Sequence, residues 1–161
     1  GMDCRYCHRG GEESWDSDVP SASACKNCHH QVLKDSPKLE LVRQSAATGE
    51  PIPWVQVHKV PGYVYFNHAV HVRRGISCVE CHGPIHQMDE VYHAQPLSIA
   101  FCLECHRDPA SRIRPVDKVT DLEWTWNSDP AIAADLQRVN GEKFVHDWNV
   151  QSLQNCSACH R

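Results

Sequence analysis

Five copies of one five-residue pattern, Cys-x-x-Cys-His, constrain what this chain can fold into. They read CRYCH, CKNCH, CVECH, CLECH and CSACH, and together they use all ten cysteines of the sequence. Two thiols three positions apart, with a histidine directly after the second, are typical of covalent attachment of a c-type haem. Zinc ribbons also pair cysteines in this way, but they do not require a histidine after every second cysteine. The pattern therefore predicts five covalently bound haem c groups.

Each motif predicts the same roles for its residues. The two cysteines form thioethers to the haem vinyl groups, and the histidine binds the iron on the proximal side. The predicted thioether residues are Cys4, Cys7, Cys25, Cys28, Cys78, Cys81, Cys102, Cys105, Cys156 and Cys159. The predicted proximal iron ligands are His8, His29, His82, His106 and His160.

The composition leaves little apolar material for a core made of side chains alone. The chain has 161 residues, of which 41% are hydrophobic, and its mean hydropathy is -0.52. Five macrocycles would supply apolar bodies on which the chain can bury surface. We therefore expect one pentahaem cytochrome c domain over residues 1–161, mostly irregular with short α-helices and wrapped around five c-type haems. The expected elements are a helix over 37–47, with Pro37 suited to its first turn and Gly49 just beyond its end, an extended or hairpin segment over 54–66 and an extended surface connection over 114–130. We expect each attachment motif to lie on a turn or a short helix.

The spacing of the motifs indicates an internal repeat, because equivalent cysteines recur after 74, 77 or 78 positions. We interpret the chain as two units and a terminal haem segment, over residues 1–74, 75–150 and 151–161. The repeat carries histidines with it, since His68 and His146 each lie ten residues before the first cysteine of a motif. By the same logic a segment before Gly1 would carry a ligand for the haem on His8. We expect that segment and an N-terminal membrane anchor to precede this sequence.

Seven of the twelve histidines lie outside the motifs and are candidates for the distal sides of the irons. The ten-residue spacing predicts that His68 serves the haem of His82 and that His146 serves the haem of His160. His71 lies three residues after His68, on nearly the same helical face, and we expect it to reach a haem of the first pair. The other candidates, each of which could instead be an ordinary core or surface side chain, are His58, His93, Met88 and His30.

Charge and location narrow the function classes. The formal net charge is -4 and no basic stripe is present, which argues against nucleic-acid binding. We expect Arg73, Arg74, Arg112 and Arg114 either to pair with haem propionates or to be solvated. Haem attachment to this motif takes place outside the bacterial cytoplasm, so we expect the protein on the periplasmic side of a bacterial inner membrane. The apolar runs of the sequence are too short to span a bilayer.

Longer stretches of the sequence resemble a known family. The segments CRYCH, IPWVQVHKVPGYVYFNHAVHVRRGISCVECHG, AQPLSIAFCLECHRDP and NCSACHR are similar to the pentahaem cytochrome c subunit of alternative complex III. The resemblance implies a subunit of a bacterial membrane complex that oxidises quinols in a respiratory or photosynthetic chain. It further implies an iron–sulfur or haem donor in the same complex, and a periplasmic cytochrome c or an oxidase as acceptor. In that family a membrane anchor precedes the first motif.

An iron with two protein ligands has no open position for a substrate. We therefore expect an electron-transfer subunit of an oxidoreductase complex rather than a catalyst on its own. Two alternatives stay open at this point. The first is a multihaem reductase of a small oxyanion such as nitrite, with one open haem site, and the second is a soluble or filament-forming electron-shuttle cytochrome. The spin state of the ferric irons distinguishes the open site from the closed ones.

Overall fold

The computed structural model describes residues 2–160. Within them the regular structure is helical, and β-pairing is limited to two isolated bridges, Val64 with His160 and Ile76 with Ile113. The α-helices are α1 (Ala22–His29), α2 (Glu40–Thr48), α3 (His68–Arg73), α4 (Cys78–His82), α5 (Ile99–Arg107), α6 (Pro130–Asp147) and α7 (Cys156–Cys159). The 3-10 helices are η1 (Cys4–Tyr6), η2 (Arg9–Glu12), η3 (Pro37–Leu39), η4 (Ile85–Gln87), η5 (Pro109–Ser111) and η6 (Val116–Lys118). The predicted fold class, mostly irregular with short helices, is confirmed.

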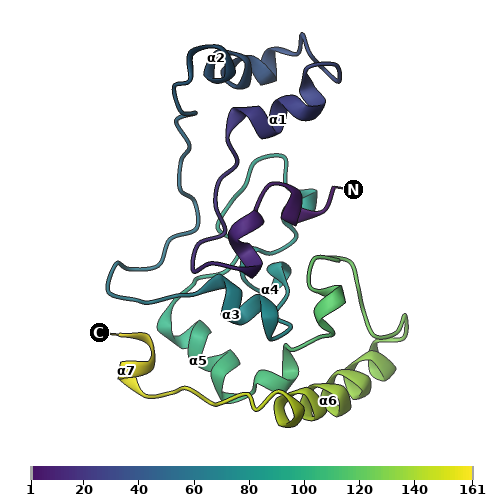
Figure 1. The fold of residues 1–161 in the computed structure, drawn as a ribbon. Helices are drawn as coiled ribbons and strands as arrows, with labels where there is room; N and C mark the ends of the chain where they lie inside the picture. Colours follow the sequence, from purple (N-terminus) through teal and green to yellow (C-terminus); the bar gives the residue numbers. More distant parts are fainter. Residues whose placement is uncertain (1, 161) are drawn as a thin grey trace.

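The helices are distributed along the length of an elongated molecule and are not stacked in layers (Figure 1). The hairpin of α1 and α2 stands at one end, α3, α4 and α5 lie in the middle, and α6 and α7 lie at the other end. The N-terminal segment with η1 and η2 lies between the hairpin and α3, although it comes first in the sequence. The attachment motifs are therefore spread along the length of the molecule.

Local sequence signals explain where the predicted helix and the longest helix begin and end. The helix expected over 37–47 is confirmed as η3 followed by α2, with Pro37 in the first turn and Gly49 at φ +81° after the last. Helix α6 begins after Asp129, whose carboxylate accepts hydrogen bonds from the N–H groups of Ala131 and Ile132 at 2.9 and 3.3 Å. The sequence analysis did not predict α6.

The segment 54–66 takes the extended form, one of the two that we expected, and does not form a hairpin. Val55 is 84% exposed, and Val64 makes its bridge to His160 rather than to a residue of its own segment. The Tyr65 N–H also donates to the Cys159 carbonyl at 2.9 Å. The backbone partner of this extended segment is thus the last motif, about a hundred positions away along the chain.

The segment 114–130 is only in part the surface connection that we expected, because two of its residues are buried. Arg114 and Val119 are buried, with exposures of 8% and 1%. The Ser77 hydroxyl, itself buried, donates to the Val119 carbonyl at 2.7 Å. This segment packs against the start of the third motif because its backbone supplies the acceptor for that hydroxyl.

Helix α6 packs directly on the backbone of η5. A Cβ added at Gly141 would lie 2.0 Å from the Ala110 carbonyl oxygen, so only glycine permits this approach. Gln137 of the same helix donates to the carbonyls of Ala110 and Ile113 at 2.8 and 2.7 Å. The Trp126 indole N–H donates in turn to the Gln137 side-chain oxygen at 2.8 Å. These contacts fix the chain that follows α5 against α6.

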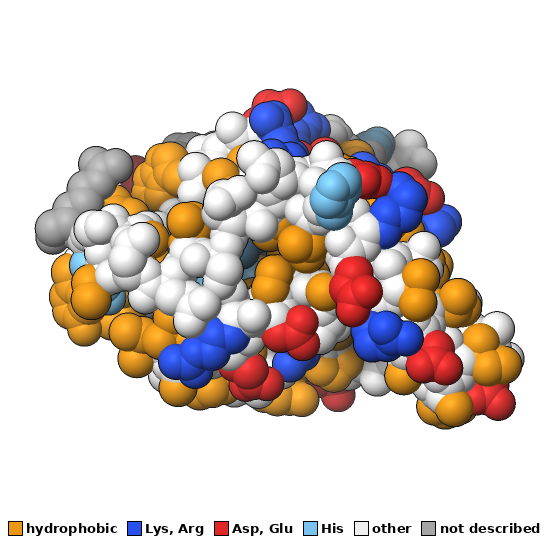
Figure 2. Space-filling view, turned by 90° about the horizontal axis from the view of Figure 1, so that it is seen from below, with side chains coloured by type: hydrophobic (Ala, Val, Ile, Leu, Met, Phe, Trp, Pro, Cys, Tyr) orange, Lys and Arg blue, Asp and Glu red, His pale blue; other side chains and the backbone are white. Residues whose placement is uncertain are grey.

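The buried part of the protein consists of few side chains. Among residues 2–160, the buried hydrophobic ones are Ala22, Ala69, Ile113 and Val119. Figure 2 shows hydrophobic side chains spread over one face of the molecule, with charges of both signs interspersed among them. No helix within residues 2–160 combines the length and apolar character that crossing a bilayer requires.

Candidate haem sites

Every attachment motif lies on a helical turn, as expected. The first cysteine pair stands at the two ends of η1, with Cys7 as its C-cap, and the other pairs lie in α1, α4, α5 and α7. The histidine of each motif directly follows its second cysteine. A helical turn places side chains three positions apart on the same face. Two thiols can therefore reach one ligand from one side, with the adjacent imidazole beside them.

The first motif has neighbours on both of its sides. The Asn27 side-chain amide, in the second motif, donates to the Tyr6 hydroxyl in the first motif at 3.1 Å. The Cys4 thiol lies close enough to the Cys78 thiol of the third motif to contribute to the raised pKa of Cys78. The first motif thus lies between the second and the third, which differs from their order in the sequence.

The remaining motifs continue this row. Cys81 of the third motif lies close enough to Cys105 of the fourth for their charges to interact, and Cys102 stands in the same relation to Cys159 of the fifth. Burial raises the pKa of Cys78 to about 11 and that of Cys81 to about 12. The order in space is therefore second, first, third, fourth and fifth, and the thiols of the central motif are neutral.

Three proximal histidines have a defined ring orientation. The Nδ1–H of His8 donates to the Asp18 carbonyl at 2.8 Å, and that of His29 donates to the Val32 carbonyl at 2.9 Å. His160 makes the same kind of contact to the Tyr63 carbonyl at 3.3 Å. A carbonyl oxygen only accepts, so Nδ1 carries the proton and Nε2 keeps its lone pair for a metal.

His68 and His71, on α3, are oriented in the same way. The Nδ1–H of His68 donates to the Trp15 carbonyl at 2.9 Å, and that of His71 donates to the Asn67 carbonyl at 2.8 Å. Asn67 also caps α3, since its side-chain oxygen accepts from the Val70 N–H at 3.2 Å. Helix α3 therefore presents two imidazoles with Nε2 free.

The ring spacings test whether these residues suit a haem iron. Two imidazoles bound to one metal have ring centres about 6 Å apart, from metal–nitrogen bonds of about 2 Å on each side. The His68 and His82 rings have centroids 6.5 Å apart and planes 9° apart. The His71 and His106 rings have centroids 6.1 Å apart and planes 82° apart. Both centroid separations are close to that of two imidazoles on one iron.

The position of His71 beside His106 differs from one expectation. We expected His71 to serve a haem of the first pair of motifs, whereas its ring faces the fourth motif. The reason is the direction of α3, which places His68 over the third motif and aims the next turn of the helix at α5. The two histidines of this helix thus face two successive motifs.

His58 and His93 gather beside the third motif. The His58 ring lies 4.3 Å from the His82 ring and 5.5 Å from the His93 ring. The first of these distances is too short for an iron between the two rings. Nε2 of His58 and Nδ1 of His82 are buried without a hydrogen-bond partner among the described residues. Burial, followed by the charge of His58, lowers the pKa of His82 to about 4, so the ring is neutral and able to bind a metal.

The hairpin at the end of the molecule holds His29 and His30 side by side. The Nδ1–H of His30 donates to the Lys26 carbonyl at 2.8 Å, which leaves Nε2 free. Both histidines line a cavity of about 330 Å³ between α1 and α2, with Lys34 and Arg43 on its walls. His30 is therefore oriented like the other metal-binding candidates.

Met88 and His146 have other surroundings. The Met88 methyl group packs beside Gly83, directly after the third motif, in the manner of a gap-filling side chain. The His146 side chain is 89% exposed, and its Nδ1 lies 3.1 Å from the Asp147 carboxylate. The His160 ring, to which the repeat assigned His146, lies 5.4 Å from the Tyr63 ring. The structure does not bring His146 and His160 together.

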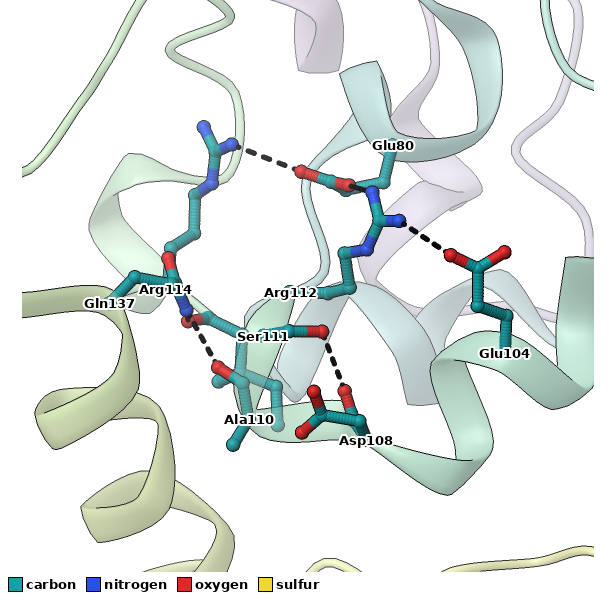
Figure 3. Close-up of polar contacts among 9 residues, drawn as sticks. Glu80, Glu104, Asp108, Ala110, Ser111, Arg112, Arg114 and Gln137 are labelled. Atoms are coloured by element: carbon teal, nitrogen blue, oxygen red, sulfur yellow. Dashed lines mark hydrogen bonds and ion pairs between the residues drawn. The ribbon is translucent and has the colours of Figure 1, made fainter. Parts of the chain in front are cut away.

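The arginines beside the central motifs bind carboxylates of the chain itself (Figure 3). Arg112 contacts Glu80 at 2.9 Å and Glu104 at 3.4 Å, and Arg114 contacts Glu80 at 3.3 Å. We had considered these arginines only as propionate partners or solvated charges. The signal that the sequence analysis missed is a glutamate directly before the second cysteine in two motifs, CVECH and CLECH.

The comparisons with known proteins agree with this description. The family described as cytochrome c7 and related cytochrome c matches residues 64–161. The multihaem cytochrome c subunit of menaquinone reductase from Nitratidesulfovibrio vulgaris is 32% identical over 83 residues, 51% of this chain and 39% of the relative. Cytochrome c-552 from Desulfotalea psychrophila is 34% identical over 61 residues, 34% of this chain and 12% of the relative. The chain thus spans well under half the length of these relatives.

Proposed function

Because the chain belongs to the family of cytochrome c7 and related cytochromes c, and is thus a multihaem c-type cytochrome involved in electron transfer, we propose that it is a five-haem electron wire. The observation that carries this proposal is the unbroken row of motifs, from the hairpin of α1 and α2 to α7. The first and second motifs share a hydrogen bond, and each of the other neighbouring pairs has thiols close enough to affect each other's pKa. A row of this kind gives an electron successive sites along the length of the molecule.

The residues of each site would bind and orient one haem. The ten motif cysteines would form the thioethers, and His8, His29, His82, His106 and His160 would be the proximal ligands. His68 and His71 would close the third and fourth sites from the distal side. His58, His93, His30, His146 and Met88 stay candidates for the other sites. A haem iron with two such ligands exchanges single electrons between its ferrous and ferric states.

The backbone fixes the orientation of these ligands. A carbonyl oxygen holds Nδ1–H in six of the seven histidine contacts that orient a candidate ring, which leaves Nε2 free for a metal. Such hydrogen bonds raise the basicity of the ligand and prevent the ring from turning. Preorganised ligands keep the geometry of an iron the same in both oxidation states. The chain is thereby suited to transfer electrons rather than to bind a substrate.

The partners of this wire follow from the resemblance and from the relatives. One relative is named as a subunit of a menaquinone reductase, and the sequence resembles the pentahaem subunit of alternative complex III. We propose that this chain belongs to a membrane complex that exchanges electrons with quinones, on the periplasmic side of a bacterial inner membrane. An iron–sulfur or haem subunit would be the donor, and a periplasmic cytochrome c or an oxidase would be the acceptor.

The double replacement Cys78→Ala/Cys81→Ala tests the proposal, because this motif is the middle member of the row. The haem content of the purified holoprotein, measured as the pyridine haemochrome, should fall from five to four per chain. Rapid reduction at one end should no longer be followed by reduction of all remaining haems, since the row is interrupted. The matched replacement in the second motif, Cys25→Ala/Cys28→Ala, should also remove one haem but leave the other four connected. Equal effects of the two variants on electron equilibration would contradict the order of sites.

A further inference from the structure

Two of the five motifs are joined by one arginine. The third and fourth motifs, CVECH and CLECH, both carry a glutamate directly before the second cysteine. Arg112 Nη1 donates to Oε2 of Glu80 at 2.9 Å, and Arg112 Nη2 lies 3.4 Å from Oε1 of Glu104 (Figure 3). One guanidinium therefore links the two attachment segments whose sites we assign to His68 and His71.

Glu80 has a second cationic partner. Arg114 Nη2 donates to Oε1 of Glu80 at 3.3 Å, so that each carboxylate oxygen faces a different guanidinium. The Glu80 side chain is only 19% exposed and that of Arg114 only 10%. A carboxylate this far from water is stable as an anion only when its charge is compensated and hydrogen-bonded. The Arg114 guanidinium carbon also lies 5.4 Å from the Trp124 ring centre, where a cation is attracted to the ring.

The backbone keeps both arginines in place independently of their charge. The Arg114 N–H donates to the Gly75 carbonyl at 2.9 Å, next to the bridge between Ile76 and Ile113. Gly75 has a φ of +76°, and a Cβ there would lie 2.2 Å from the Arg114 carbonyl oxygen. Gln137 of α6 holds the Ile113 carbonyl from the other side at 2.7 Å. The side chains are thus aimed at Glu80 by packed backbone, which is how a site fixes a charge at one position.

We propose that Arg112 and Arg114 are positioning residues that hold Glu80 between the third and fourth haem sites and set the reduction potentials of those two sites. The inference rests on the proposed function, because it assigns a role to charges within the attachment segments. A negative charge near a site favours its more positive ferric state, and a positive charge favours its ferrous state. The negative charges of the two glutamates cancel the positive charges of the two arginines. Neutralising any one of the four side chains, Glu80, Glu104, Arg112 or Arg114, therefore leaves one unbalanced charge beside both sites.

The test is a charge cycle on the holoprotein, followed by spectroelectrochemical titration. Glu80→Gln should raise the midpoint potentials of the two central sites, and Arg112→Gln should lower them, each with a several-fold change in the ferrous to ferric ratio at a fixed applied potential. The double variant Glu80→Gln/Arg112→Gln keeps the net charge of the cluster and should return toward the wild-type potentials. If these residues served only packing, both single replacements would shift the midpoint potentials in the same direction. The double variant would then show the largest shift. That result would overturn the inference.

Two controls separate the inference from folding and from the proposed function. Arg138→Gln removes the same charge from an exposed pair on α6, where Arg138 lies 3.7 Å from Glu142, and should leave all potentials unchanged. Arg112→Lys keeps the charge and should give potentials close to those of the wild type, and a shift as large as that of Arg112→Gln would contradict a role of charge. If the wild-type protein lacks haem in the third and fourth motifs, the proposed function fails. If it holds five haems and the cycle gives no shifts of opposite sign, only this inference fails.

Discussion

Replacing His68 or His71 with alanine is expected to change two different irons. The His68 ring faces His82 at 6.5 Å, and the His71 ring faces His106 at 6.1 Å. Each replacement removes one of two axial nitrogens from one site and leaves every cysteine in place, so the covalent haem content should not change. In a chain with five haems, about one fifth of the iron should convert from low spin to high spin in either variant.

Low-temperature EPR of the ferric protein can distinguish these two irons. Imidazoles with parallel planes donate into the same iron orbital, whereas perpendicular ones donate into different orbitals. The planes are 9° apart in the His68–His82 pair and 82° apart in the His71–His106 pair. We therefore expect a rhombic low-spin spectrum from the third site and a spectrum dominated by one large g value from the fourth. His68→Ala should remove the former and His71→Ala the latter.

The control for this experiment is His86→Ala. Nε2 of His86 lies 3.4 Å from the Glu123 carboxylate, so this histidine already has a partner and should not bind an iron. All low-spin signals should persist in that variant. Loss of the same signal in His68→Ala and His71→Ala would refute the assignment of the two histidines of α3 to successive motifs, and so would loss of covalent haem in either one.

Two further predictions concern the packing of α6, each measured by urea unfolding of the holoprotein. Gly141→Ala should lower the free energy of unfolding by about 2 kcal/mol, because overlap with the Ala110 carbonyl outweighs the gain of about 1 kcal/mol in helix propensity. An unchanged or raised stability would show that α6 and η5 are further apart than described. Asp129→Ala should cost about 1 kcal/mol through the loss of the N-cap, whereas Asp129→Asn, which keeps an acceptor, should cost much less.

The sequence predicted well those features that depend on neighbouring residues. The cysteine pairs and their histidines lie on helical turns because a spacing of three positions suits one turn. The helix over 37–47 was predicted from Pro37 and Gly49, and both residues have the expected roles at its ends. These features need no knowledge of the rest of the chain, since the signals lie within the elements that they start or stop.

Helix α6 was missed although it carries similar signals. Asp129 and Pro130 mark its start, as an N-cap and a first-turn proline do elsewhere. Its interior gave no clear apolar stripe, because the residues that contact η5 are Gly141 and Gln137 rather than large hydrophobic ones. Hydrophobic periodicity detects helices that bury apolar side chains, and this helix packs through a close backbone approach and amide hydrogen bonds.

Contacts between distant segments were beyond the reach of the sequence. Glu80 and Arg112 are 32 positions apart, and nothing in either neighbourhood indicates the other. The same holds for the extended segment that pairs with the last motif through Val64 and His160. Such pairs form because packed elements bring distant residues together. They can therefore be predicted only when the fold is known, and not from local sequence patterns.

The repeat shows most directly why equal spacing does not give equal geometry. His68 and His146 precede their motifs by the same ten positions, but His68 is the first residue of α3 and His146 is the second-last residue of α6. Side chains on an α-helix point toward its N-terminus, so a ring in the first turn projects beyond the start of the helix, where His68 meets the Trp15 carbonyl from a distant part of the chain. A ring in the last turn lies over the surface of its own helix instead, and the His146 side chain is 89% exposed beside the neighbouring Asp147 carboxylate. The spacing limits how far a ligand can reach, but the end of the helix on which it sits decides the direction in which it reaches.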